Sequence, residues 1–482
     1  MGWRCSLSAG MDAPTLPPEL LADLPPAVLA YIRWLEARVA QLEARVADLE
    51  AKLNQNSTNS SKPPSADPPG VKRAPPKPKS GKKAGGQPGH PKHERAPVDR
   101  PDHVRECKPT ACRRCARPLA GDDPEPLRHQ VTELPPVTPV VTEYRRHRLK
   151  CSKCGVTTCG ELPAGVAGQD GPRLRAACAL LTGAFRLSKT KAARLLTDLF
   201  GVPLSPAQVC ATEAAVGEQL QPAVAALLDA ARGHPANVDE TGMGKGRWLW
   251  VLVTAVATVF RIAGGRTKRA FLDLVGTTYG SVVTSDRYRA YDHLPDWRHQ
   301  LCWSHLRRDF QAMIDRQTAG SAVGDELLAL SDEMFALWKR VRDGTLTYRR
   351  FGGKMHAARD FRTRFREALG RGTGCGCAFT EATCQELLDR EISLFVFAFR
   401  AGVEPTNNAA ERAVRHGVLW RKQSGGPKSA AGAVYLANIW SVVETCRQHG
   451  EDVWAYLTAC VEAADHGRPL PKLLAVAEAQ AA

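Results

Sequence analysis

The sequence lacks an apolar run long enough to cross a bilayer. Its longest run, Trp248–Phe260, falls short of the roughly 20 consecutive apolar residues that a spanning helix needs, and its Val and Thr favour a strand. No basic stretch followed by an apolar one opens the chain, as it would in a secretory signal. We therefore expect a cytoplasmic protein with no membrane partner, in which residues 1–27 form an N-terminal tail.

Acidic residues are scarce relative to basic ones. Lys and Arg together number 66 against 50 Asp and Glu, which gives a formal net charge of +16. This excess favours a polyanionic partner, above all nucleic acid, although many basic proteins bind no such partner. With 482 residues the chain is also too long for a single core, so we expect about two to four domains.

The 15 cysteines are spread over a long chain of cytosolic character, where disulfides are rare. Metal binding, or burial as reduced thiols, is therefore their expected role. Four of them form two Cys-x-x-Cys pairs on either side of a Thr- and Val-rich segment predicted to form strands: Cys112, Cys115, Cys151 and Cys154. Because zinc takes four thiolates in tetrahedral geometry, residues 101–165 are predicted to be a zinc-binding ribbon with a single structural Zn²⁺. Unrelated buried cysteines are the alternative, and Cys107 and Cys159 are near enough to compete as ligands.

Residues 28–54 carry a heptad pattern. Apolar residues recur in alternating steps of four and three, with Glu, Arg and Gln among the intervening residues, at Val28, Ile32, Leu35, Val39, Leu42, Val46, Leu49 and Leu53. So narrow a stripe predicts a coiled coil and hence a homo-oligomer. The alternative is a single amphipathic helix that docks on its own domain.

Basic residues predicted to contact DNA fall in two places. Residues 55–100 are rich in Ser, Pro, Gly and Lys, and are predicted to be a disordered basic linker because they cannot bury enough apolar surface to fold. Their cations would track phosphates, or would only solvate a linker. Basic residues beside the first cysteine pair suggest that the ribbon also contacts DNA, although zinc ribbons are often purely structural. The predicted DNA contacts are Lys72, Arg73, Lys77, Lys79, Lys82, Lys83, Arg113 and Arg114.

Residues 172–232 have a helical pattern. Ser205 and Gln208 predict a helix that starts with a capping box. Together with a helix predicted over Lys189–Phe200 it would form a helix-turn-helix, and the segment is assigned as a helical DNA-binding domain. Because the second helix carries Glu213 and little positive charge, a packing role is the alternative.

The pattern then changes to that of a sheet. Strands are predicted over residues 235–241, 248–255, 258–263 and 280–285, with a helix over residues 269–275. Residues 307–402 are charged and amphipathic, which predicts helices, and residues 446–482 are again helical. The chain is therefore predicted to be a multidomain α/β protein.

Three acidic residues stand out: Asp239, Asp286 and Glu411. Phosphodiester chemistry on two metal ions needs carboxylates from distant parts of a chain, because hard oxygen ligands must hold each ion while positions stay open for phosphate and water. Each acid also has a structural interpretation: Asp239 as a turn residue after a strand, Asp286 as a helix N-cap, and Glu411 as the end of a capping box. Glu240 and Asp292 are the nearest decoys, and Glu240 is expected to point to the opposite face of the strand from Asp239.

Several motifs follow one another in a specific order. The heptad segment precedes Asn-Gln-Asn-Ser-Thr-Asn-Ser-Ser-Lys-Pro-Pro-Ser at Asn54 to Ser65 and Gly-Gly-Gln-Pro-Gly-His at Gly85 to His90. The cysteine pairs and the three acids come next. This order, over most of the chain, resembles that of the IS66 family of insertion-sequence transposases.

The resemblance implies a ribonuclease-H-like catalytic core in two parts, residues 233–306 and 403–445, with residues 307–402 as a helical insertion. In such a core the first acid ends strand one and the second ends strand four. It also implies a DDE transposase, in which Asp239, Asp286 and Glu411 hold two Mg²⁺ (or Mn²⁺) ions per active site. The implied partners are double-stranded DNA at element ends and target, further copies of the chain, and accessory proteins of the same element, at the bacterial nucleoid.

Four accessory residues are expected near the acids, two from the same resemblance and two from their place on the helix that Glu411 opens. Cys302 and His305 match a Cys-x-x-His element that follows the second aspartate in several transposases. His305 would orient DNA or a water molecule, or else pack beside Trp303. Arg412 and Arg415 would hold phosphates, with surface solvation as the alternative.

Two other classes of function remain open. A zinc-containing DNA-binding regulator derived from a transposase would tolerate the loss of an acid, whereas all three are present. A ribonuclease-H-like nuclease would share the metal site but would not need the heptad segment, the linker and the helical insertion.

Overall fold

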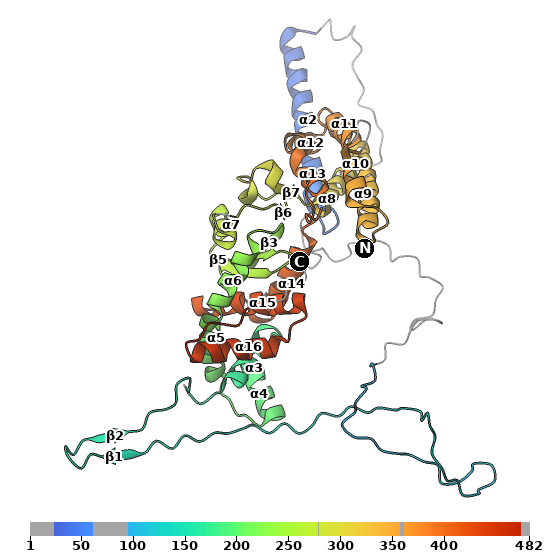
Figure 1. Cartoon of the computed structure of the whole chain (residues 1–482). Coiled ribbons are helices and arrows are strands. Elements are labelled where there is room, and N and C mark those ends of the chain that lie inside the picture. Colours follow the sequence, from blue (N-terminus) through green and yellow to red (C-terminus); the bar gives the residue numbers. More distant parts are fainter. Residues whose placement is uncertain (1–23, 61–94, 167, 278, 357–360, 474–482) are drawn as a thin grey trace, which may run out of the picture.

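The computed structural model describes residues 24–60, 95–166, 168–277, 279–356 and 361–473 (Figure 1). They form a mixed sheet covered by helices, a further group of helices beside it, a long helix near the N-terminus and an extended arm. Of the helices described, none is long and apolar enough to span a membrane. The expectation of a multidomain α/β protein is confirmed.

The sheet has the order β5-β4-β3-β6-β7. Its strands are β3 (Ala236–Gly244), β4 (Arg247–Val253), β5 (Thr258–Ala263), β6 (Val283–Ser285) and β7 (His299–Leu301). The first three form an antiparallel meander, whereas β6 runs parallel to β3 and β7 runs parallel to β6. The carboxyl ends of β3, β6 and β7 therefore meet at one edge of the sheet.

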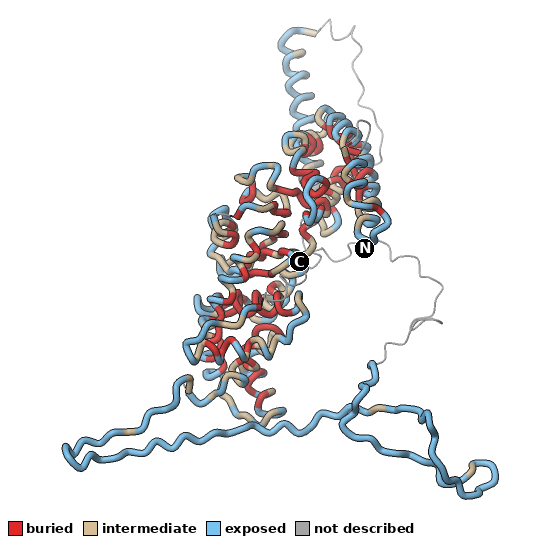
Figure 2. Tube along the Cα trace, in the orientation of Figure 1, coloured by how far each residue is buried: buried red, intermediate tan, exposed pale blue. Residues whose placement is uncertain are grey.

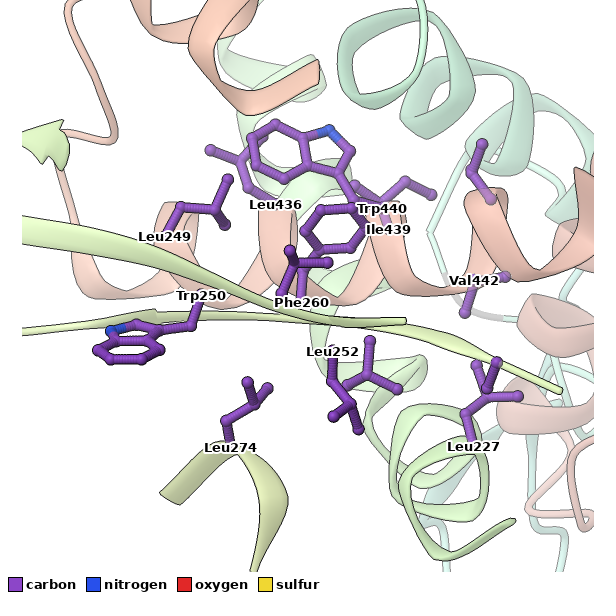
Figure 3. Close-up of a cluster of buried hydrophobic side chains, with 14 of the residues drawn as sticks. Leu227, Leu249, Trp250, Leu252, Phe260, Leu274, Leu436, Ile439, Trp440 and Val442 are labelled. Atoms are coloured by element: carbon purple, nitrogen blue, oxygen red, sulfur yellow. The ribbon is translucent and has the colours of Figure 1, made fainter. Parts of the chain in front are cut away.

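Helices cover both faces of the sheet. On one face lie α14 (Asn408–Ser424) and α15 (Ala430–His449), and on the other lies α7 (Lys268–Val275). Leu249 points toward Trp440 of α15, whereas Trp250 points to the side of Leu274 of α7 (Figure 3). Because side chains alternate along a strand, β4 contributes to a core on each face, and its residues from Trp248 to Val253 are all apolar.

A second group of helices follows the sheet. It comprises α8 (Trp303–Asp315), α9 (Ser321–Arg342), α10 (Tyr348–His356), α11 (Phe361–Gly372), α12 (Ala378–Asp389) and α13 (Glu391–Phe399). Their core is aromatic: Trp303 contacts Phe365 and Phe395, and its Nε1–H donates to the Leu394 carbonyl oxygen at 2.8 Å. Most of the chain between Asp286 and Glu411 is therefore helical.

Four helices directly precede the sheet, of which the first, third and fourth pack against α15 and the second packs on the first and third. They are α3 (Pro172–Gly183), α4 (Lys189–Phe200), α5 (Pro206–Gln219) and α6 (Gln221–Ala231), and α16 (Val453–Asp465) packs on α3. The capping box at Ser205 is confirmed. In α5, a Cβ atom added at Gly217 would come within 2.8 Å of the Tyr435 Cα atom, so the two helices are in close contact. The exposed residues of α5 include Cys210 and Glu218 and no cation, which favours the packing role over groove recognition.

The heptad segment forms one helix, α2 (Pro26–Leu53), whose apolar stripe is exposed: Val39 by 52%, Leu42 by 48% and Leu49 by 50%. It is not docked on its own domain through this stripe. Residues 55–60, expected to begin a disordered linker, instead form a turn that Asn59 anchors to α8, with its Nδ2 donating to Asp315 Oδ2 at 2.8 Å. The predicted DNA contacts Lys72, Arg73, Lys77, Lys79, Lys82 and Lys83 lie outside the described residues.

The arm spans residues 95–166 and is exposed over most of its length (Figure 2). Its two strands, β1 (Arg148–Lys150) and β2 (Thr157–Cys159), form a short hairpin. The strands expected between the cysteine pairs are wrong for residues 119–147, which the structure describes in full and which form none. Val140 and Val141 there are exposed by 95% and 87%, so their β-propensity has no partner strand or apolar face to act on.

Candidate active site

Asp239 lies within β3 and not at its end. The strand continues to Gly244 because β4 stays paired with it, and Asp239 itself lies opposite Val251. The expectation that Asp239 ends the first strand is therefore wrong. On its other side, β3 pairs with β6 only at Ala236 and Asn237. The pairing therefore ends before Asp239, which has no partner in β6. Asp286 directly follows β6, as expected.

Glu411 lies in the first turn of α14, close above β3. The N-cap of this helix is Asn407, whose side chain makes no capping bond in the described structure, so the capping-box interpretation of Glu411 is wrong. Asn407 is fully buried and ties the helix start to its neighbours: its Nδ2 donates to the Val238 carbonyl oxygen at 3.3 Å and its backbone N–H to Cys302 Sγ at 3.4 Å. These bonds hold Glu411 near the carboxyl ends of the strands.

Asp239 and Glu240 point to opposite faces of the sheet. Residues directly opposite one another in an antiparallel pair share a face, and Asp239 pairs with Val251 whereas Glu240 pairs with Trp250. Asp239 therefore faces α14, the helix that carries Glu411. Glu240 is buried on the α7 side, where the Tyr291 hydroxyl donates to its Oε2 atom.

The three predicted acids lie near one another. Burial raises the pKa of Asp239 well above its ordinary value, and the negative charges of Glu240, Asp286 and Glu411 raise it further. A strand, a strand end and a helix thus bring the three carboxyl groups near enough for their charges to interact. In the described part of the chain, however, no three His, Cys, Asp or Glu side chains are arranged as ligands of one metal ion.

An arginine that the sequence analysis did not identify connects two of the carboxylates. Arg266 Nε donates to Glu240 Oε1 at 2.5 Å, and its Nη2 donates to Asp286 Oδ2 at 3.3 Å. Its guanidinium lies 3.5 Å from the centre of the Tyr288 ring. Glu240 therefore belongs to a buried ion pair that supports Asp286 from the face opposite to Asp239.

Hydrogen bonds from neighbouring residues also fix the position of Asp286. Its Oδ1 accepts the Tyr288 backbone N–H at 3.0 Å, and the short 3₁₀ turn that follows starts only at Arg289, so Asp286 is not a helix N-cap. The preceding Ser285 donates to the Asp286 carbonyl oxygen and contacts His299 Nε2 at 2.8 Å. Arg390 Nη2 donates to His299 Nδ1 at 2.8 Å. Because arginine can only donate, Nδ1 accepts and Nε2 carries the proton that it gives to Ser285.

His305, in the first turn of α8, lies in the site. Its Nε2 is 3.6 Å from Glu411 Oε1, and its Nδ1 is buried with no hydrogen-bond partner in the described chain. Burial lowers the pKa of His305, which favours the neutral ring. The interpretation of His305 as a residue packed beside Trp303 does not account for this contact with Glu411. Cys302 is different: burial raises its pKa to about 11, and its thiol accepts the Asn407 N–H, which indicates a structural role.

A stripe of cations follows Glu411 along α14. Arg412, Arg415 and Lys422 are exposed, and with Leu419 they are spaced by three, four and three residues, which places them on one side of the helix. None of the three cations takes part in an ion pair within the described residues. We refer to them as the α14 stripe.

The cysteine pairs form two similar turns. In the first turn, the Cys112 N–H donates to the Arg117 carbonyl oxygen, and the Ala116 N–H donates to the Cys112 carbonyl oxygen. In the second turn, the Cys151 N–H donates to the Val156 carbonyl oxygen, and the Gly155 N–H donates to the Cys151 carbonyl oxygen. Backbone N–H groups that point at the sulfur lower the pKa of Cys112 and of Cys151. The two turns thus share one backbone geometry, but within the described residues the four thiols Cys112, Cys115, Cys151 and Cys154 are not gathered around one point.

Comparison with known proteins gives two family matches. A family model described as "Transposase IS66 family" matches residues 168–435, which include all three acids, and one described as a "Family of unknown function (DUF6444)" matches residues 20–96. The uncharacterized protein y4qI of Sinorhizobium fredii (strain NBRC 101917 / NGR234) is 24% identical over 311 residues. The match covers 57% of this chain and 56% of that protein, so it spans little more than half of the relative. No solved structure matches the chain.

Proposed function

The chain belongs to the IS66 family of transposases, and on that premise we propose that it is a DDE transposase, which cuts DNA at the ends of an insertion sequence and joins the freed 3′-hydroxyl to target DNA. The observation that carries this proposal is the approach of Asp239, Asp286 and Glu411, within the matched residues, from three separate elements. The family accounts for a transposase role. The two-metal chemistry and the roles of single residues are our proposal.

The strand order supports a ribonuclease-H-like core. Three antiparallel strands followed by two parallel ones, in the order β5-β4-β3-β6-β7, are what such a core requires. The helices α8 to α13 then form an insertion between the second and third acids. Glu411 returns to the sheet on α14, on the same face as Asp239.

The donor set fits divalent magnesium or manganese. Carboxylate oxygens are the hard ligands that these ions prefer, whereas Cys302 is a neutral, buried thiol. Burial and the negative charges of the neighbouring carboxylates raise the pKa of Asp239. A divalent cation would compensate these charges and favour the ionised form. When bound, two such ions would lower the pKa of an attacking water molecule and stabilise the leaving 3′ oxygen.

Neighbouring side chains position the substrate and the acids. Arg266 holds the Asp286 carboxylate through its Nη2 contact, and neutral His305 orients Glu411 or a water molecule beside it. The α14 stripe starts one residue after Glu411 and would hold the phosphates next to the scissile one. The strand to be cut would thus lie along α14 with its scissile phosphate above Asp239.

The remaining segments support assembly on DNA. The exposed stripe of α2 is complementary to another copy of itself, so we propose a homo-oligomer. The two cysteine turns of the arm would close around a structural Zn²⁺ and place Arg113 and Arg114 on the DNA. The proposal also includes accessory proteins of the same element as partners. The protein would act on nucleoid DNA in the bacterial cytoplasm.

Substitution of the three acids tests this function. With DNA from the flanks of the gene and Mg²⁺, Asp239→Asn, Asp286→Asn and Glu411→Gln should each abolish cleavage and joining but keep DNA binding, because shape is retained and charge is lost. Two substitutions should be scarcely worse than one, since the site acts as a unit. Glu240→Gln, on the opposite face, is the matched control and should reduce activity much less.

Other outcomes have definite meanings. If Glu411→Gln cleaves and joins as the parent protein does, Glu411 is not the third ligand. Cleavage without any joining would favour the nuclease alternative. Binding without cleavage by the parent protein, over a range of Mg²⁺ and Mn²⁺ concentrations, would favour the regulator.

A further inference from the structure

A cavity of about 870 Å³ lies apart from the carboxylates. Its walls are the end of α3, the first turns of α4 and α15, one side of α5, and the turn that follows α14. This volume is in the range of small-molecule sites. The cavity therefore has room for a ligand where the helices before the sheet meet the end of α14.

The lining combines an exposed aromatic ring with unpaired cations. Phe185 is 57% exposed at the cavity, and Arg186, Lys191 and Lys428 take part in no ion pair within the described residues. Arg186 Nε is buried and has no hydrogen-bond partner in that part of the chain. Glu213 is the cavity's carboxylate, and it is paired with Lys189 at 2.9 Å. An aromatic face beside free cations matches a nucleotide, whose base stacks while its phosphate is neutralised.

The cavity adjoins the end of α14, and its wall includes Gln423, which follows Lys422 of the α14 stripe. Trp420 faces the side of α14 opposite to Glu411, so a strand that follows the stripe would reach the cavity by turning around the end of the helix. Trp420 lies nine residues after Glu411, so at 1.5 Å per residue their separation along the helix axis is roughly 14 Å. That axial distance alone corresponds to about four nucleotides of a stacked strand, each about 3.4 Å long.

We propose that this cavity takes one unpaired nucleotide of the bound DNA, a few positions from the scissile phosphate. Its base stacks on Phe185, and its phosphate is held by Arg186, Lys191 and Lys428. The inference rests on the proposed function, because it uses the strand path along α14. A base inside a duplex must be turned out of the stack to enter such a pocket, and this costs least where its partner base is missing.

A binding experiment tests the pocket without cleavage. Full-length protein with Asp239→Asn is titrated with short duplexes that are fully paired or carry a single unpaired 2-aminopurine at successive positions. We expect about tenfold tighter binding at one position, in line with the contribution of base–aromatic stacking, and a change in 2-aminopurine fluorescence at that position. Phe185→Ala should remove both the preference and the fluorescence change. Leu199→Ala, equally apolar and 64% exposed but outside the cavity, should remove neither.

Three results would overturn the proposal: no preference at any position, a preference that survives Phe185→Ala, or a preference lost equally with Leu199→Ala. Lys191→Ala and Lys428→Ala give a second test. They should weaken binding of the duplex with an unpaired base more than binding of the fully paired duplex. Equal weakening of both would indicate a phosphate contact without a nucleotide pocket. Cleavage by the unsubstituted protein is measured separately, so loss of the proposed function and loss of the pocket give different results.

Discussion

Adjacent residues of β3 have opposite roles because the strand alternates. Asp239 faces Glu411, and the pKa of its carboxyl group is raised by burial and by three neighbouring negative charges. Glu240 is also buried, but Arg266 and Tyr291 satisfy both of its oxygens. A carboxylate already paired in this way is poorly placed to accept a metal ion. The local chemistry thus distinguishes the proposed ligand Asp239 from the paired Glu240.

His299 gives the fold a pH dependence. It is fully buried, and burial together with the Arg390 charge lowers its pKa to about 3. The folded state therefore binds fewer protons than the unfolded state below pH 6.5 or so, and stability falls as the pH falls until about pH 3, where the folded state also takes up the proton. From pH 7 to pH 5 the loss from this residue should be about 2 kcal/mol in the free energy of unfolding.

Urea unfolding at the two pH values measures this effect. His299→Gln removes the titrating group, so its loss of stability between pH 7 and pH 5 should be smaller than that of the parent protein. The exposed His103→Gln is the matched control and should leave the pH dependence unchanged. An equal pH dependence for His299→Gln and the parent would show that His299 is not the group responsible.

At the residue scale the sequence indicated the acids but not their supports. Alternation along a strand was sufficient to separate Asp239 from Glu240, and motif order pointed to Glu411. Arg266, His299 and Arg390 could not be found, because they act through contacts between residues far apart in the chain and follow no local pattern. The cavity beside Phe185 was missed for the same reason.

Among the elements, those with a strong local signal were predicted and those that depend on a partner were not. The capping box at Ser205 and the helix over the heptad segment are determined by neighbouring residues, and both form. The predicted strands within residues 119–147 had suitable residue types but no partner to bond with. β3 extends beyond Asp239 for the converse reason, since β4 supplies its partner. Pairing decides strands, and pairing is not local.

The helix α2 should determine the oligomeric state. Its apolar stripe is exposed in one chain, and a lone helix would leave these leucines in water. Deletion of residues 26–53, or Leu42→Asp with Leu49→Asp, should therefore lower the molecular mass in light scattering. The exposed Glu43→Gln, outside the stripe, should not change it. A monomer both with and without α2 would contradict the prediction.

The two cysteine turns of the arm should bind roughly one zinc ion per chain. Metal analysis of the purified protein should find it, and Cys112→Ser with Cys151→Ser should abolish it, because each turn loses a thiolate. The distant sheet should stay folded by circular dichroism, since a zinc site contributes its binding energy to local folding. Cys210→Ser, an exposed cysteine outside both pairs, is the control. Retention of zinc by the double variant would assign the ligands elsewhere.

Across the whole molecule, α2 and the candidate site are both connected to α8. The turn after α2 is anchored on Asp315 at the end of α8, and the first turn of the same helix carries His305 beside Glu411. Asp309, between them, binds Arg287, the residue after Asp286. The described part of the Asn-rich motif, residues 54–60, therefore links α2 to the helix that carries His305, a contact that its polar composition did not reveal.

The charge of the whole chain should appear in the salt dependence of DNA binding. A protein with a formal net charge of +16 that neutralises phosphates releases counterions, so the logarithm of its affinity should fall linearly with the logarithm of salt concentration. Each phosphate contact contributes about 0.9 to this slope, and replacing Arg412, Arg415 and Lys422 together with Gln should make it shallower by about 2 to 3. Asp239→Asn should leave the slope close to that of the parent, because the acid carries no phosphate contact. Affinities measured by fluorescence anisotropy over a salt series decide between these outcomes, and an unchanged slope in the triple variant would mean that the DNA does not follow α14.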